Sequence, residues 1–328
     1  MEKTYRKKRP PYGFNFLDTD ATEKMEIKTR EIQDLLKKEG FRGVTPASID
    51  YPETFESYEN YDAFRFRDTS GDDLWLRSDA TVQVIKGFAN LLEMEPGETS
   101  ESKYYYLSSV FRDVRKSYPS PREVYQLGVE VIGAPSNECI DSLILLAHQV
   151  LKGSFAIKHC ILIGDIRISE FLNNHWENIP VRELSMKRDV PGLISELVEV
   201  GYEKDQAREL ARLLLFPLET DDWFAAMEDF QSKLTGEQSK TVQKILDLAM
   251  PLKDLYKKLA DENVPVRWDP LLTRKVNYYT GFIFEGYVEG IPNAPLRGGA
   301  YDGLVAKYSS MDLPAGGFAL DLTSLILL

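Results

Sequence analysis

An alternating run at residues 122–132, REVYQLGVEVI, constrains the fold of this chain more than any other feature. Successive side chains of a β-strand point to opposite faces of a sheet, so this run separates apolar from polar side chains. The wholly apolar face carries Tyr125, Leu127, Val129 and Val131. The opposite face carries Val124, Gln126, Gly128 and Glu130. If helices cover the apolar face, an amide and a carboxylate flank a glycine whose missing side chain lets a ligand approach the backbone. A solvated sheet face is the alternative interpretation.

Further alternating runs predict that this strand belongs to an antiparallel sheet. The run FRFRDTSGDDLWLR is typical of a hairpin around a Ser-Gly-Asp-Asp turn, and YYYLSSVFR supplies a partner strand just before residues 122–132. KHCILIGDI and NYYTGFIFEGYVEG also have strand patterns, whereas residues 18–40 and 137–152 have helical spacing. Because strands follow strands without regular βαβ alternation, we predict an α+β fold, an antiparallel sheet flanked by helices.

A long helical stretch interrupts these strand patterns. Residues 166–260 are rich in Leu, Glu and Lys, and strand signals return only after them. The length of 328 residues suits either two average domains or one larger domain with an insertion. We therefore predict a first part of the core at residues 1–165, a helical insertion at 166–260 and a second part of the core at 261–328.

Charge and composition exclude several classes of protein. A net charge of -12 argues against a broad nucleic-acid surface, because such affinity comes largely from Lys and Arg. No apolar run approaches membrane-spanning length, and the basic N-terminus lacks an apolar signal core, so we expect a cytoplasmic protein without a membrane partner. Cys139 and Cys160 are expected to be reduced thiols. His148, His159 and His175 are scattered without metal-like spacing, so no metal site is predicted.

Polar residues at the ends of several predicted strands suit an amino-acid ligand. These residues are Arg77, Asp79, Arg112, Arg274, Tyr278 and Tyr279. Arginine holds a carboxylate through two parallel hydrogen bonds, and carboxylate, amide and phenol oxygens accept from an ammonium group. A phosphate chain fits less well, because the chain has no GxxxxGK loop and two acidic residues would repel it. Gly298, Gly299 and Gly303 are expected to form a tight turn, placed against the ligand or serving only as a turn.

Several separate motifs resemble the core of class II histidyl-tRNA synthetases, in the family's order and over almost the whole chain. LWLRSDAT is similar to the family's LRPEGT segment, and VFRDVRKSYPSPREVYQLGVE is similar to its motif 2. RKVNYYTG and GGAYDGL are similar to its two histidine signatures, and GGFALDLTSL is similar to its motif 3. Pro46 lies where the motif 1 proline follows a strand. This resemblance implies a class II synthetase-like core with a helical insertion.

The resemblance also implies a histidine pocket. Carried over residue by residue, it places around bound histidine Asp79, Thr81, Arg112, Gln126, Glu130, Arg274, Tyr278, Tyr279 and Tyr301.

The same resemblance implies that groups that use ATP are missing. Val114 stands where motif 2 has an adenine-facing glutamate, and Thr323 and Ser324 replace the Glu-Arg pair of motif 3. Ser120 lies near the position of a phosphate-facing arginine. Cationic groups stabilise the charge that develops in adenylate chemistry, and losing one such donor typically costs about a hundredfold in rate. We therefore expect no catalytic residues and no cofactor.

A second resemblance follows from these departures. The sequence ends at Leu328, directly after the motif 3-like segment, so no anticodon-binding domain is expected. Together with LSMKRDVPGLISEL in the insertion, this combination resembles the family of regulatory subunits of short-form ATP phosphoribosyltransferase, the first enzyme of histidine biosynthesis. The resemblance implies a homodimer of the class II core, assembled with separate catalytic chains, in which histidine is the allosteric effector that lowers flux through the pathway.

Two other hypotheses remain open from the sequence. A truncated synthetase paralogue would still activate histidine or another amino acid, as the order of the motifs and Arg112 allow. An interaction protein would use the same fold as a scaffold with an empty pocket.

Overall fold

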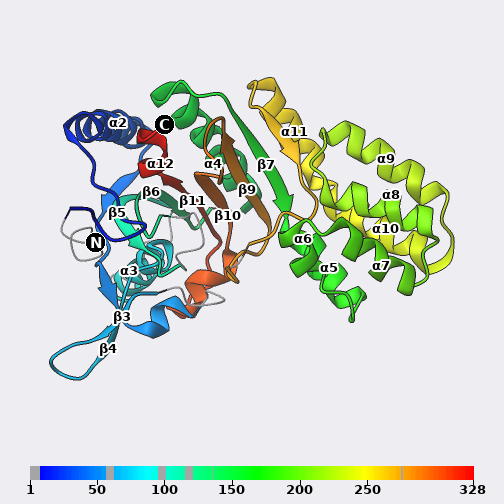
Figure 1. The fold of residues 1–328 in the computed structure, drawn as a ribbon, viewed down its shortest axis with the longest axis horizontal. Helices are drawn as coiled ribbons and strands as arrows, with labels where there is room; N and C mark the ends of the chain where they lie inside the picture. The colour runs from blue at the N-terminus through cyan, green and yellow to red at the C-terminus, as the bar shows by residue number, and fades with distance from the viewer. Residues whose placement is uncertain (1–7, 57–62, 95–100, 115–120, 135, 275) are drawn as a thin grey trace.

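A computed structural model gives the fold and describes all residues except 1–7, 57–62, 95–100, 115–120, 135 and 275 (Figure 1). The strands are β1 (Arg42–Val44), β2 (Ile49–Asp50), β3 (Arg65–Arg67), β4 (Asp73–Leu76), β5 (Ser102–Phe111), β6 (Glu123–Ile132), β7 (His159–Asp165), β8 (Val266–Trp268), β9 (Phe282–Val288), β10 (Leu296–Ala300) and β11 (Ala315–Asp321). The α-helices are α2 (Thr19–Lys38), α3 (Thr81–Met94), α4 (Ser136–Gln149), α5 (Ile166–His175), α6 (Val181–Lys187), α7 (Val190–Glu199), α8 (Lys204–Leu215), α9 (Thr220–Ser232), α10 (Gly236–Ala249), α11 (Pro251–Asp261) and α12 (Leu322–Ile326). A π-helical turn, η2 (Val150–Ser154), extends α4, and the 3-10 helices are η1 (Pro52–Phe55) and η3 (Asp302–Lys307).

An eight-stranded sheet in the order β1-β5-β6-β11-β10-β9-β7-β8 forms the centre of the fold, and β2, β4 and β3 form a small second sheet. All neighbouring pairs from β5 to β7 are antiparallel, as the alternating runs predict. The two edge pairs, β1 with β5 and β7 with β8, are parallel. The predicted α+β class is therefore confirmed, but the sheet is mixed, because crossover connections bring the short edge strands in parallel.

Helices cover both faces of the large sheet. Leu127, Val129 and Val131 of β6 pack in one hydrophobic core with side chains of α2, α4 and α12, as their alternation predicts. On the other face, side chains of α3 and η3 pack against Tyr104, Tyr106 and other sheet residues. The polar face of β6 is therefore buried, and the interpretation as a solvated face is wrong. Glu130 is only 1% exposed and Gln126 only 6% exposed.

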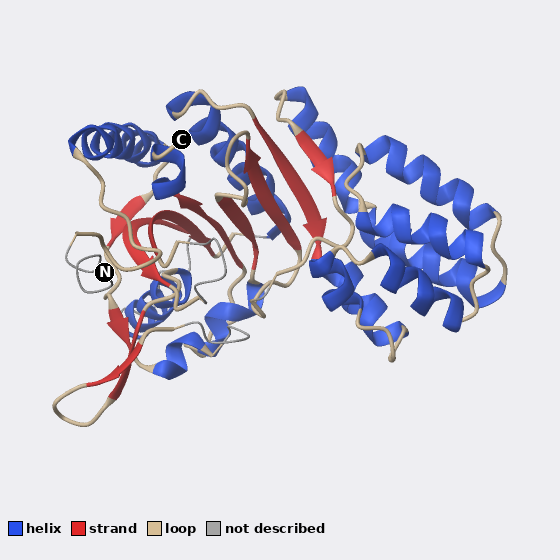
Figure 2. Cartoon of the chain, in the orientation of Figure 1, coloured by secondary structure: helices blue, strands red, loops and turns tan. Residues whose placement is uncertain are grey.

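The helices α5 to α11 all lie between β7 and β8 in the chain. In Figures 1 and 2, α7 to α10 extend away from the sheet, while α5 and α6 lie at the junction below the end of β7. Parallel neighbours need a long crossover connection, and these helices supply it for β7 and β8. Of the described helices, none has the length and apolar character that a membrane span requires.

The glycine-rich segment near residue 300 differs from its prediction. Gly298 and Gly299 do not form a turn but lie in β10, between β9 and β11. A Cβ atom at Gly298 would lie 2.4 Å from Cζ of Phe284. Glycine at this position therefore leaves room for the large side chains of the neighbouring strands, which lie over it. Only Gly303 belongs to a turn-like element, η3.

Gly128 also has another role than the sequence predicts. The register pairs Gly128 with Tyr106 of β5, and a Cβ atom at this glycine would lie 2.0 Å from Cζ of Tyr106. The ring of Tyr106 is fully buried and occupies the space that the glycine leaves. The missing side chain therefore accommodates a neighbouring tyrosine, and the backbone is not open to a ligand at this position.

We expect Gly128→Ala to destabilise the fold by about 1–3 kcal/mol, because overpacking displaces a buried ring. Gly87→Ala in α3 is the matched control, since nothing lies within 4 Å of a Cβ atom there and alanine favours a helix. Urea unfolding of both variants measures the difference. Equal unfolding free energies would contradict the packing role of Gly128.

Candidate functional site

Asp79 lies two residues before the start of α3 and is 8% exposed. Its Oδ1 accepts a hydrogen bond from the backbone N–H of Thr81 at 2.6 Å, and its Oδ2 accepts one from the hydroxyl of Tyr278 at 3.2 Å. Burial raises the pKa of Asp79, while the bond from Thr81 and the charge of Arg112 offset part of that shift. The start of α3 thus holds a carboxyl group against the tyrosine segment at residues 278–279.

Glu130 is the second buried carboxyl group. Its Oε2 accepts a hydrogen bond from the hydroxyl of Tyr301, and both groups lie over Gly317, where a Cβ atom would lie 2.1 Å from Glu130 Oε2. Burial raises the pKa of Glu130 to about 8, and the charge of Asp79 adds to the shift. Glu130 is therefore mainly protonated at neutral pH.

Three tyrosines connect the two carboxyl groups. The ring centroids of Tyr278 and Tyr279 are 4.7 Å apart, and Tyr301 meets Tyr278 edge-on at 5.6 Å. Burial raises the pKa of all three phenols, so they remain hydroxyl donors at physiological pH. Tyr278 and Tyr301 donate to Asp79 and Glu130 respectively, so the tyrosines and acids form one cluster.

Arg274 lies beside this cluster and is 9% exposed. It donates from Nη2 to the carbonyl of Phe284 at 2.9 Å and forms a 2.8 Å ion pair from Nη1 to Glu285. Burial would raise the pKa of Glu285, but the charge of Arg274 and the hydroxyl of Tyr287 outweigh it and lower that pKa. The charge of Arg274 also lowers the pKa of Tyr279, which burial raises.

The structure brings most of the predicted site residues together. Those in mutual contact or electrostatic reach around the two acids are Asp79, Thr81, Glu130, Arg274, Tyr278, Tyr279 and Tyr301. Arg112 acts on Asp79 through its charge and lowers the pKa of this carboxyl group. Gln126 shares the polar face of β6 but lies four residues from Glu130, about 13 Å along an extended strand.

The positions of two residues, Arg77 and Tyr106, differ from what the sequence predicts. Arg77 is buried, and its guanidinium group donates to the backbone carbonyls of Pro46 and Ser109, both at 2.6 Å. Tyr106, by contrast, was not predicted, yet it lies near both acids and Thr81. Its signal was its position opposite Gly128 in the paired strands, which requires the register of β5 and β6.

Two buried acceptor atoms indicate what the site could bind. Glu130 Oε1 and Gln126 Oε1 have no hydrogen-bond partner among the described residues, although Thr81 lies near enough to Glu130 to lower its pKa. Gln126 Oε1 is an acceptor at every pH, and Glu130 Oε1 is an acceptor when its carboxyl group is ionised. A buried acceptor without a donor costs about 1–3 kcal/mol, so a ligand that supplies N–H groups would recover that energy and favour the ionised form of Glu130. The acids and unpaired acceptors therefore favour a small ligand rich in N–H donors.

Four residues stand where the resemblance places ATP-using groups, and two of them form hydrogen bonds within the protein. Thr323 Oγ1 accepts from the backbone N–H of Tyr125 at 2.9 Å, and Ser324 Oγ donates to Asp321 at 2.6 Å, where Asp321 caps α12. Val114 supplies no polar group. Ser120, the fourth such position, lies outside the described residues. Both hydroxyl groups form hydrogen bonds within the protein. Neither Thr323 nor Ser324 carries the positive charge that stabilises adenylate chemistry.

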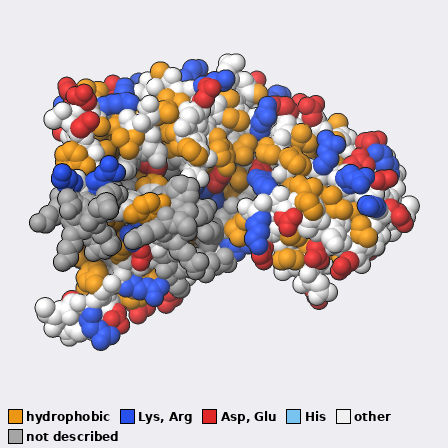
Figure 3. All heavy atoms as spheres, viewed as in Figure 1, with side chains coloured by type: hydrophobic (Ala, Val, Ile, Leu, Met, Phe, Trp, Pro, Cys, Tyr) orange, Lys and Arg blue, Asp and Glu red, His pale blue; other side chains and the backbone are white. Residues whose placement is uncertain are grey.

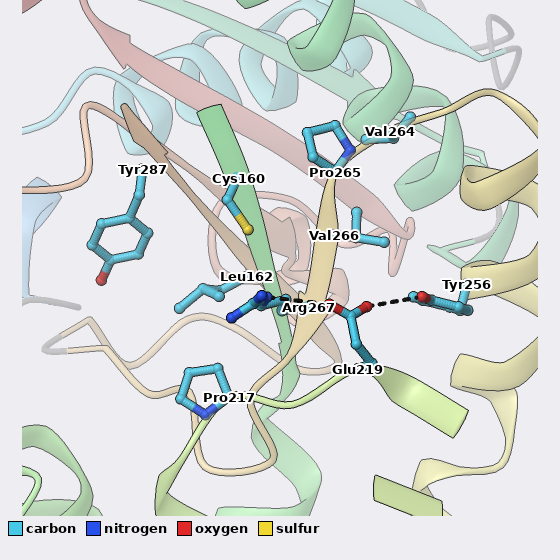
Figure 4. Close-up of a pocket in the computed structure, with 10 residues that line it drawn as sticks. All are labelled: Cys160, Leu162, Pro217, Glu219, Tyr256, Val264, Pro265, Val266, Arg267 and Tyr287. Carbon is cyan, nitrogen blue, oxygen red and sulfur yellow. Dashed lines mark hydrogen bonds and ion pairs between the residues drawn. The ribbon is translucent and has the colours of Figure 1, made fainter. Parts of the chain in front are cut away.

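A separate open cavity of about 610 Å³ lies at the far edge of the sheet, beside β8 (Figure 4). Its polar groups pair with one another, since Arg267 forms a 3.3 Å ion pair with Glu219 and Tyr256 donates to the same carboxylate. No predicted site residue lines it. In Figure 3, acidic and basic side chains are interspersed on the visible face of α7 to α10.

His148 and His159 lie close together in the structure, although they are separated in the sequence. His148 Nδ1 and His159 Nε2 are 2.9 Å apart, and His159 Nδ1 lies 2.8 Å from the carbonyl of Ile157. Burial lowers the pKa of His148. In the described part of the chain, no three His, Cys, Asp or Glu side chains gather as a metal site. Cys139 and Cys160 are both free thiols.

The raised pKa of Glu130 predicts a pH dependence of stability. Because the folded state holds this proton more tightly than the unfolded chain, the stabilising effect is complete below pH 4.5 and is lost as the pH rises through about 8. The shift corresponds to a contribution on the order of 5 kcal/mol. We expect Glu130→Gln, which is neutral at every pH, to lose less stability than wild type between pH 5 and pH 8. Urea unfolding at both pH values measures this; parallel losses in the two proteins would refute the assignment.

This chain resembles known proteins both in sequence and in fold. The family model for histidyl-tRNA synthetase matches residues 13–325. The ATP phosphoribosyltransferase regulatory subunit of Leptospira interrogans is 25% identical over 98% of this chain and 94% of that protein. The histidine–tRNA ligase of Pyrobaculum aerophilum is 27% identical over 88% of this chain and 67% of that protein. A crystal structure from Bacillus halodurans, described as an ATP phosphoribosyltransferase regulatory subunit/histidyl-tRNA synthetase, has a TM-score of 0.79 at 22% identity and covers 98% of this chain and 83% of that one.

That structure has the same fold, which confirms the expected class II synthetase-like architecture. The match to a named regulatory subunit likewise confirms the second resemblance drawn from the sequence. Since the family model spans nearly all of the described residues, the chain belongs to the histidyl-tRNA synthetase family.

Proposed function

We propose that this chain is a non-catalytic regulatory subunit of ATP phosphoribosyltransferase, needed for the first step of histidine biosynthesis and for its feedback regulation by histidine. The observation that carries the proposal is the nearly end-to-end match to a regulatory subunit, which covers 94% of that protein. The hydroxyl groups of Thr323 and Ser324, committed to internal hydrogen bonds, support the absence of catalysis.

Histidine suits the buried cluster chemically. Its ammonium group can donate to Asp79, and an imidazole N–H can donate to Glu130 Oε1, which has no partner in the described part of the chain. Its carboxylate can approach the charges of Arg112 and Arg274. An N–H donor favours the ionised form of Glu130, so binding should lower the pKa of this group and release a proton. Asp79, Thr81, Gln126 and the three tyrosines complete the proposed pocket.

Feedback requires that histidine bind the inhibited assembly more tightly than the active one. In this proposal the partner is the catalytic subunit of a short-form ATP phosphoribosyltransferase, the core forms a homodimer, and the complex acts in the cytoplasm. Neither nucleic acid nor a membrane takes part.

The partner can be tested by co-purification with a short-form catalytic chain. We expect mixing to activate that chain and histidine to reverse the activation. In the Glu130→Gln variant, loss of a hydrogen bond to a charged group should weaken histidine binding at least tenfold in calorimetry and raise the inhibitory concentration equally. Glu219→Gln, in the cavity of Figure 4, is the matched control and should behave as wild type.

The outcomes of this assay separate the hypotheses. Activation without any effect of histidine would leave a scaffold with an empty pocket. Failure of the two chains to associate or to activate would reject the proposed role altogether.

A histidine-activating enzyme is the second candidate, favoured by the ligase relative and by Arg112. Because Val114 has no polar group to contact adenine and neither Thr323 nor Ser324 supplies a cationic group, we expect no histidine-dependent exchange of pyrophosphate with ATP. The assay needs high protein concentration and an active histidyl-tRNA synthetase as positive control. Exchange above background that depends on histidine would establish the enzyme instead.

A further inference from the structure

One face of α6 runs along the segment that leads into the tyrosines of the site. Arg182, Ser185 and Arg188 are three residues apart, so they project from one side of this helix and its C-terminal cap. The facing segment, residues 269–277, connects β8 to the tyrosines at 278–279 and then to β9. In Figure 1, α6 lies at the junction between the helices and the sheet.

Each of the three α6 residues donates a hydrogen bond to this segment. Arg188 forms an ion pair with Asp269, with Nη1 3.0 Å from Oδ1. Ser185 donates its hydroxyl hydrogen to the carbonyl of Leu271. Arg182 donates from Nη2 to the carbonyl of Arg274 and, at 3.0 Å, to Oδ1 of Asn277. The donors therefore follow the segment in order, from its start to the residue before Tyr278.

The segment has little regular structure of its own. Its described residues lie outside the named helices and strands. Asp269 is attached to β7 by a 2.8 Å backbone bond to Ile163, and Leu272 donates back to Asp269 at 3.1 Å. Farther along, Arg182 donates to the carbonyl of Arg274 and to Asn277, and Arg274 donates to the carbonyl of Phe284. Such a segment is readily displaced when these contacts are lost.

We propose that Arg182, Ser185 and Arg188 are positioning residues, which hold residues 269–277 and thereby orient Tyr278 and Tyr279 against Asp79. The helical region and the buried site are then conformationally linked, because α6 belongs to one and Tyr278 to the other. By linkage, a ligand that fixes the tyrosines also fixes α6, and a partner that moves α6 changes affinity at the site. The identity of that ligand rests on the proposed function, whereas the positioning role does not.

Hydrogen exchange read by mass spectrometry tests the positioning role without any ligand. In Arg182→Ala, we expect peptides that cover residues 269–281 to exchange at least about tenfold faster than in wild type, while peptides from β6 are unchanged. Arg208→Ala is the matched control, because Arg208 forms an ion pair with Asp205 on α8 at 2.7 Å and should leave the segment protected. Equal protection of residues 269–281 in Arg182→Ala and wild type would overturn the proposal.

A conservative variant separates positioning from general packing. Arg182→Lys keeps one cationic donor and should recover part of the protection lost in Arg182→Ala. Identical exchange in the two variants would overturn the role of the donated hydrogen bonds. If Arg182→Ala does not fold, Arg182→Lys is compared with wild type. Faster exchange confined to residues 269–281 then supports the proposal, and uniformly faster exchange overturns it.

Adding histidine tests the link between the two regions. In wild type we expect histidine to slow exchange both at residues 269–281 and in α6, and in Arg182→Ala we expect at least tenfold weaker binding and no response of α6. Binding without a response of α6 in wild type would overturn the link. If histidine does not bind wild type, the histidine pocket fails, while the ligand-free exchange still decides the positioning role.

Discussion

Two acidic groups, Asp79 and Glu130, are buried in this fold, and the structure around them must satisfy both. A buried carboxylate is costly unless it is paired, hydrogen-bonded or protonated. Here the solution combines a backbone N–H at the start of α3, hydroxyl donors from Tyr278 and Tyr301, and a proton on Glu130. Glycine at position 317 leaves the space in which Tyr301 and Glu130 meet.

Patterns local to one strand or helix were readable from the sequence, and contacts between elements were not. The alternation in β6 predicted both of its faces, and helical spacing predicted α2, because each pattern follows from the geometry of one element. The three-residue β8 carries too little pattern to recognise. The roles of Gly298 and Gly128 were predicted wrongly. In a sequence, a glycine in a turn looks the same as a glycine in a strand whose missing side chain makes room for an aromatic ring of the neighbouring strand.

The candidate site was likewise predictable only in part. Motif resemblance identified Asp79, Glu130 and the tyrosines, and the structure brings them together. It gave no indication that Arg77 supports the backbone or that α6 donates to residues 269–277, since those contacts join positions far apart in the chain.

The parallel pairing of β7 and β8 has a consequence for the modularity of the chain. Register places the start of β8 beside Ile161, whereas β7 continues to Asp165, so the exit and entry points of the helical region lie at opposite ends of the strand pair. A tight turn cannot replace these helices, because a parallel partner is reached only by a connection of roughly a dozen residues or more. The region therefore cannot be trimmed away as a removable module; a shortened chain would need a substitute bridge across the sheet to keep its edge strand.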